Sequence, residues 1–133
     1  MAELKDLLQS ADWKTEKHVP VIEAPETVKK GEMFKVTVSV GKEVAHPNQT
    51  QHHIRWICLY FRPKDEKFPI QLGEFAFTAH GESIQGPDTS GVYSHPEASV
   101  SFKTDKSGTI YAISYCNIHG LWQSSAELKV KPA

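Results

Sequence analysis

The amino-acid sequence predicts an all-β protein, built as an antiparallel β-sandwich of about seven strands. Short segments rich in β-branched and aromatic residues recur along the chain, and turn-forming residues separate them. Almost no segment carries the 3.6-residue apolar period of a helix. The chain has 133 residues, of which 39% are hydrophobic and 23% are charged, so it fits one globular domain with a single core.

The predicted strands differ in how clearly the sequence marks them. Residues 34–40 alternate apolar and polar side chains, which is the period of a half-buried strand. Pro20 in the first strand indicates an edge or an irregular start. Gly73 is a candidate β-bulge in a long or bent fourth strand. The seven predicted strands are residues 19–23, 34–40, 54–61, 68–79, 98–103, 109–115 and 125–130.

The N-terminal segment and the overall composition exclude several classes of protein. Residues 2–9 predict one short helix, and they lack the basic start and continuous apolar run of a signal peptide. No apolar stretch is long enough to span a bilayer, and the formal net charge of −1 gives no global attraction to nucleic acid. Two cysteines make no disulfide framework, so the sequence predicts a cytoplasmic protein.

The residues that carry chemistry are one cysteine and several histidines. Cys116 and His119 stand three residues apart directly after the strand at 109–115, a spacing that lets a thiolate and an imidazole converge on one transition metal. Three further stretches upstream supply His18, His46 and the pair His52 and His53. Because neighbouring side chains in a strand point to opposite faces, only one member of the pair is expected to reach a metal.

His52 is the predicted member of that pair, since it shares its face with Ile54, Trp56 and Cys58, an apolar set expected to point inward. The other histidines, His53, His80 and His95, are interpreted as surface or hydrogen-bonded side chains, and Cys58 as a small core residue.

Three metals fit one thiolate and several imidazoles. Structural zinc would take four ligands and close the site, as in a non-enzymatic interaction domain. Copper would suit a cupredoxin-like electron-transfer protein, although the expected axial methionine is absent because Leu121 and Trp122 follow His119. Iron with four imidazoles and one thiolate would keep a sixth position open for a substrate.

Four motifs, taken in order, resemble those of one known family. They are EKHVPVI at residues 16–22, GKEVAHPN with QHHI at 41–48 and 51–54, AHGES at 79–83, and SYCNIHGLW at 114–122. The chain is similar to the superoxide reductases, the family of neelaredoxin and desulfoferrodoxin, from about Asp12 to its end. Ala45, Gln49 and Gln51 depart from commoner family residues but remove no candidate ligand. A four-cysteine rubredoxin-like module is absent, so the resemblance is to the one-iron class.

This resemblance implies a set of roles and partners. His18, His46, His52 and His119 are implied as equatorial iron ligands, with Cys116 as the axial thiolate. Glu16 is implied as a ligand of the oxidised state and Lys17 as the lysine beside the open position. The implied activity is reduction of superoxide to hydrogen peroxide, with electrons from an external donor such as rubredoxin. The implied fold is an immunoglobulin-like sandwich, residues 1–133 forming one domain with an extension at 1–12, often assembled as a homotetramer.

Overall fold

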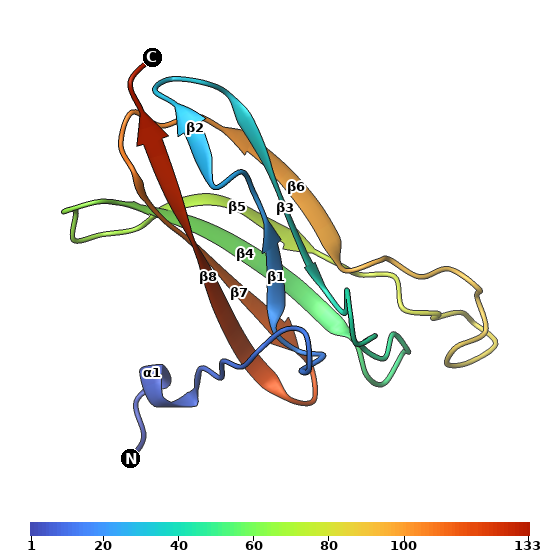
Figure 1. The fold of residues 1–133 in the computed structure, drawn as a ribbon. Coiled ribbons are helices and arrows are strands. Elements are labelled where there is room, and N and C mark those ends of the chain that lie inside the picture. Colours follow the sequence, from blue (N-terminus) through green and yellow to red (C-terminus); the bar gives the residue numbers. More distant parts are fainter.

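The computed structural model describes residues 1–133 and folds as two β-sheets packed face to face (Figure 1). One sheet has three strands in the order β1-β3-β6, and the other has five in the order β2-β8-β7-β4-β5. The elements are α1 (Leu4–Leu7), β1 (Pro20–Glu23), β2 (Thr27–Lys29), β3 (Phe34–Val40), β4 (Ile54–Pro63), β5 (Ile70–Ala76), β6 (Glu97–Phe102), β7 (Gly108–Cys116) and β8 (Gly120–Lys131). The predicted all-β sandwich is therefore confirmed.

The structure adds one strand to the seven predicted and lengthens another. β2 has three residues and buries only Val28, so it carries no period for sequence reasoning to detect. It pairs with β8 in parallel, so the sheets are not purely antiparallel. β8 begins at Gly120 instead of residue 125, because backbone pairing with β7 continues through residues 120–124, whose burial does not alternate. The predicted strand at 68–79 is shorter, and the predicted helix shrinks to a single turn.

Two bulges shift the register of β4. Leu59 pairs with Gly73 and Tyr60 with Gln71, which leaves Leu72 unpaired beside the glycine predicted to mark a bulge. A second irregularity lies at Arg55, between the pairs Ile54 with Cys116 and Trp56 with Tyr115. An extra residue in a strand reverses which side chains face inward beyond it. The bulge at Arg55 therefore separates the face of His52 from that of the residues after it.

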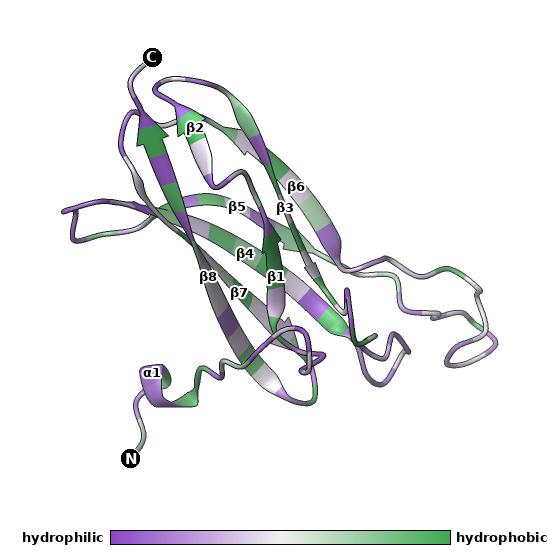
Figure 2. Ribbon diagram, in the orientation of Figure 1, coloured by the Kyte–Doolittle hydropathy of each residue, from purple (hydrophilic) through white to green (hydrophobic).

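Because of this reversal, the prediction that Trp56 and Cys58 point inward with His52 and Ile54 is wrong. Ile57 and Leu59 are fully buried, whereas Trp56 and Cys58 are only half-buried on the outer face of the five-stranded sheet. Cys58 is consequently not a core residue. The core lies between the two sheets and is mainly aliphatic, and hydrophobic bands recur along the strands that line it (Figure 2). Its fully buried members include Val36, Val38, Ile57, Leu59 and Ile110.

The strand order brings several loops to one end of the sandwich. The start of β1, the end of β3, the start of β4 and the turn from β7 to β8 all lie at the lower end in Figure 1. These are the segments that carry the candidate ligands. No helix in the structure has the length and apolar character needed to cross a membrane.

Candidate metal centre

Five predicted ligands come from four segments at this end of the sandwich. His18 precedes β1, His46 lies in the loop after β3, and His52 stands two residues before β4. Cys116 is the last residue of β7, and His119 lies in the turn that leads to β8. Rigid strands thus aim side chains from both sheets into one region, the usual way a β-sandwich builds a site from its loops.

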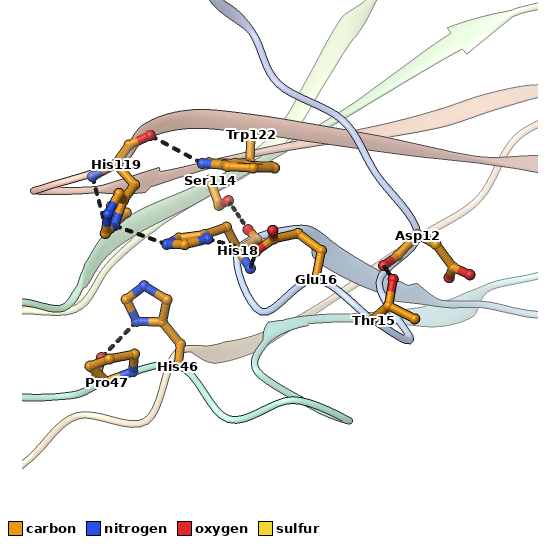
Figure 3. Close-up of polar contacts among 10 residues, drawn as sticks. Asp12, Thr15, Glu16, His18, His46, Pro47, Ser114, His119 and Trp122 are labelled. Carbon is orange, nitrogen blue, oxygen red and sulfur yellow. Dashed lines mark hydrogen bonds and ion pairs between the residues drawn. The ribbon is translucent and has the colours of Figure 1, made fainter.

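The donor atoms converge. Those of His18, His52, Cys116 and His119 all lie within 4.8 Å of one another. His18 Nε2 is 3.1 Å from His119 Nδ1, and Cys116 Sγ is 3.9 Å from the same nitrogen. His46 joins the group through its ring, whose centroid is 4.8 Å from that of His18 and 4.9 Å from that of His52. In Figure 3 the rings of His18 and His119 point toward each other, with His46 beside them.

Hydrogen bonds set which ring nitrogen faces the centre. His18 Nδ1 lies 2.7 Å from Glu16 Oε1, and His46 Nδ1 lies 2.6 Å from the carbonyl oxygen of Pro47. A carboxylate and a carbonyl can only accept, so each Nδ1 carries the proton and each Nε2 keeps a lone pair. Such outer hydrogen bonds fix the ring orientation of metal-bound histidines.

Two ring nitrogens identify the centre as a metal site. His46 Nε2 and His52 Nε2 are buried and make no hydrogen bond. A buried polar atom without a partner is costly, and a ligand commonly explains it. Imidazole nitrogens with one thiolate sulfur are donors that iron, copper and zinc accept. The residues present therefore fit a single transition-metal ion.

Burial keeps the imidazoles in the form that binds metal. It lowers the pKa of His46 to about 4, against a weaker opposing effect of the Pro47 carbonyl. Burial also lowers the pKa of His18 and of His52, and the charge of Lys17 acts in the same direction on all three rings. At neutral pH these rings are uncharged, as ligation requires.

The cysteine and the last histidine are brought together by a tight hairpin. Cys116 pairs with Gly120 across three turn residues, and Gly120 has a φ of +80°, a conformation that glycine adopts without strain. Cys116 is fully buried, and its sulfur accepts a hydrogen bond from the His119 backbone N–H at 3.4 Å. This bond to a thiolate is of the kind that tunes a metal–sulfur centre.

Comparison with known proteins agrees with this site. The family model for desulfoferrodoxin matches residues 10–125. The chain belongs to the desulfoferrodoxin family. A superoxide reductase of Pyrococcus furiosus is 55% identical over 126 residues, which cover 95% of this chain and 99% of the relative. The neelaredoxin of Megalodesulfovibrio gigas is 52% identical over 126 residues, covering 95% and 97%. The solved superoxide reductase (neelaredoxin) of Archaeoglobus fulgidus in the reduced form superposes with a TM-score of 0.86 at 56% identity, covering 92% of this chain and 98% of that one.

Several neighbours hold the ligands of this desulfoferrodoxin-family protein in place. The Trp122 ring stacks on His18 with centroids 4.9 Å apart and an interplanar angle of 14°, and its Nε1–H donates to the His119 carbonyl at 3.2 Å (Figure 3). Ser114 Oγ donates to the His18 carbonyl at 3.2 Å. Trp122 therefore covers one side of the His18 imidazole.

The two predicted catalytic residues, Glu16 and Lys17, directly precede His18. Glu16 Oε1 accepts hydrogen bonds from the His18 backbone N–H and from Nδ1, so its carboxylate lies on the side of the ring away from Nε2. Burial raises the pKa of the Glu16 carboxyl, but the two hydrogen bonds from His18 outweigh it and the net pKa is lowered. Lys17 is half-buried, and its charge reaches the rings of His18, His46 and His52.

Two of the three histidines not predicted as ligands form a separate contact. His53 and His80 are both buried, and their rings stack with centroids 3.5 Å apart and an interplanar angle of 5°. Each ring is hydrogen-bonded, His53 to the carbonyl of Gln49 and His80 to that of Phe77. This agrees with their interpretation as hydrogen-bonded side chains. Sequence reasoning did not single out Asn117, and its only signal is its position between Cys116 and His119.

A separate cavity lies away from this centre. It has a volume of about 1100 Å³ and lies where β4 ends and β7 begins, at the opposite end of these strands from the donor cluster. Its lining mixes charges of both signs, including Glu26, Arg62, Lys64 and Glu127. Because no group of metal donors converges there, the cavity is not part of the metal centre.

Proposed function

We propose that this protein is a superoxide reductase that reduces superoxide to hydrogen peroxide by one electron. The observation that carries the proposal is the convergence of a buried cysteine sulfur with histidine donors, all within 4.8 Å, in a chain of the desulfoferrodoxin family. The iron would be held by His18, His46, His52, His119 and Cys116. Bound there, iron would supply the electron that superoxide takes up.

The chain's own residues prepare the site for a small anion. Lys17 places a positive charge next to neutral imidazoles, in a protein whose formal net charge is −1. A local positive field of this kind raises the association rate of an anion, by roughly tenfold or more. We expect Lys17 to hold superoxide and to organise the water that would supply protons as the product leaves. With iron bound, the Cys116 thiolate would donate electron density to it, and the hydrogen bond from the His119 N–H to the sulfur would limit that donation.

Glu16 is proposed as the ligand that closes the oxidised site. Its carboxylate would first have to leave the two hydrogen bonds it accepts from His18. The Glu16 backbone N–H donates to the Asp12 carbonyl at 2.9 Å, in the turn that precedes His18.

The electron donor, the cellular location, the assembly and the extent of the domain are proposals as well. The chain has only two cysteines, so it carries no rubredoxin-like four-cysteine module, and an external donor such as rubredoxin would supply the electrons. Both cysteines are free, which supports a reducing, cytoplasmic setting. A homotetramer is supported by the half-exposed outer face of the five-stranded sheet, where Trp56 stacks on Tyr115. Residues 1–133 would act as one domain, with 1–12 as its extension.

Metal analysis and a product assay test the proposal together. Protein expressed without added metal should contain about one iron per chain, and it should consume superoxide as a reduced donor is oxidised. Hydrogen peroxide should form without oxygen, because the iron is re-reduced by the donor and not by a second superoxide. Stoichiometric copper or zinc in place of iron, or oxygen release, would refute the proposal. If light scattering shows a monomer, the homotetramer is excluded and the proposed activity is not affected.

A further inference from the structure

Asn117 makes three hydrogen bonds to the segment that carries His52. Its backbone N–H donates to the His53 carbonyl at 3.2 Å, and its side-chain Oδ1 accepts the His53 N–H at 2.9 Å. Its Nδ2 donates to the Gln51 carbonyl at 3.0 Å. The two side-chain hydrogen bonds therefore hold Gln51 and His53, the residues on either side of His52.

His52 differs from two other candidate ligands in how its ring is oriented. His18 and His46 each have a hydrogen bond on Nδ1, to Glu16 and to the Pro47 carbonyl. The His52 ring has no such bond, and its Nε2 is buried without a partner. Its direction is therefore set by packing against the rings of His46 and His119 and by the backbone that carries it. That backbone pairs with Gln49 at His52 itself and is held by Asn117 on either side of His52.

Asn117 also belongs to the hairpin that supplies two other donors. It lies between Cys116 and His119, 64 residues from His53 in sequence. Its hydrogen bonds thus join the thiolate hairpin to the loop before β4. The chain's other asparagine, Asn48, holds the same loop from another side, because it donates to the Ser94 carbonyl and faces His80. Asn48 makes no contact of this kind with the hairpin.

The residue type matters at position 117. An amide offers an acceptor and a donor on the two arms of one short side chain, which the His53 N–H and the Gln51 carbonyl require. Aspartate has the same shape but no donor at neutral pH, so it would place a carboxylate oxygen against the Gln51 carbonyl. Alanine would remove both side-chain bonds and keep the backbone one.

We propose that Asn117 is a positioning residue that holds the His52 imidazole in register with Cys116 and His119 for metal binding. This inference rests on the metal ligands of the proposed function, though not on superoxide as the substrate. Outer hydrogen bonds of this type change metal affinity by about 10- to 100-fold when removed.

The test is a double-mutant cycle read out by cobalt affinity. Co²⁺ is titrated into the metal-free protein in competition with a chelator, for wild type, Asn117→Ala, His52→Ala and the double variant. Asn117→Ala should weaken binding by about 10-fold or more in the wild-type background. In the His52→Ala background it should change binding by less than about twofold, because the ligand it positions is gone. Equal losses in both backgrounds, or no loss in either, would overturn the proposal.

The absorption spectrum of the cobalt-bound protein and two further variants test the proposal independently of affinity. The thiolate-to-cobalt absorption should persist in Asn117→Ala, since Cys116 stays in place; its loss would mean that Asn117 supports the hairpin itself and would overturn the proposal. If Asn117→Ala does not fold, Asn117→Asp replaces it in the same double-mutant cycle. Asn117→Asp should also weaken cobalt binding in the wild-type background and have no effect in the His52→Ala background. Thr109→Val is the matched control, because it removes a side-chain hydrogen bond to Glu127 from the far end of β7. Cobalt binding needs no superoxide, so failure here is distinguishable from failure of the reductase proposal.

Discussion

Removing the metal should destabilise this protein by a predictable amount. Without an ion, His46 Nε2 and His52 Nε2 stay buried and unpartnered. Each such group costs about 1–3 kcal/mol, so metal binding relieves roughly 2–6 kcal/mol in total. Mass action gives a comparable stabilisation of the folded state. It is about 2.7 kcal/mol when the free metal concentration is 100 times Kd, and about 4.1 kcal/mol when it is 1,000 times Kd. The expected stabilisation is therefore about 3–4 kcal/mol, a rise in Tm of roughly 10–15 °C for a chain of this size.

Calorimetry of metal-free and metal-loaded protein measures this difference directly. His52→Leu gives a matched comparison, because it removes one unpartnered nitrogen without breaking any hydrogen bond of the ring. Metal-free His52→Leu should be at least as stable as the metal-free wild type, while its gain on adding metal should be smaller. A wild-type Tm that rises by less than about 2 °C at saturating metal would refute the reasoning.

Three further predictions concern single residues. Cys116→Ser should abolish both turnover and the thiolate-to-iron charge-transfer absorption; a variant that kept both would disprove the axial assignment. Lys17→Ala should slow the reaction with superoxide by roughly tenfold at low salt and flatten its ionic-strength dependence, with Lys17→Arg as the charge-preserving control in pulse radiolysis. Burial lowers the pKa of His80 below its ordinary value near 6.5, more than the Phe77 carbonyl raises it, with smaller effects from His53, Glu82 and Arg55. As pH falls below about 6.5 the unfolded chain binds a proton at His80 that the folded chain resists, so stability should decline. In urea unfolding His80→Gln should show a shallower decline; an identical slope would exclude this histidine.

The fold was predictable where side-chain patterns and strands coincide. Residues 34–40 alternate cleanly and form β3 with the expected bounds. β2 and the first half of β8 escaped prediction because backbone pairing with neighbouring strands, and not side-chain burial, holds them in place. Pairing partners distant in sequence leave no local pattern to detect.

The candidate ligands were predictable because metal chemistry restricts their residue types. His52, the member of its pair expected to face a metal, lies in the donor cluster, but the reason given for that expectation was wrong. A bulge at Arg55 turns the later residues of β4 over, so Trp56 and Cys58 face outward. The role of Asn117 could not be predicted, because it depends on hydrogen bonds with a segment that only the fold brings near.

The short hairpin at Cys116 also bears on the order in which the centre is assembled. Cys116 and His119 approach through local contacts, whereas His18 and His119 are 101 residues apart and meet only after a long loop has closed. Local contacts form early in folding and distant ones late. A nascent chain can therefore present a two-donor half-site before the sandwich is complete, and ions added during refolding should speed the later step. Refolding rates that are the same with and without metal would show that capture follows folding instead.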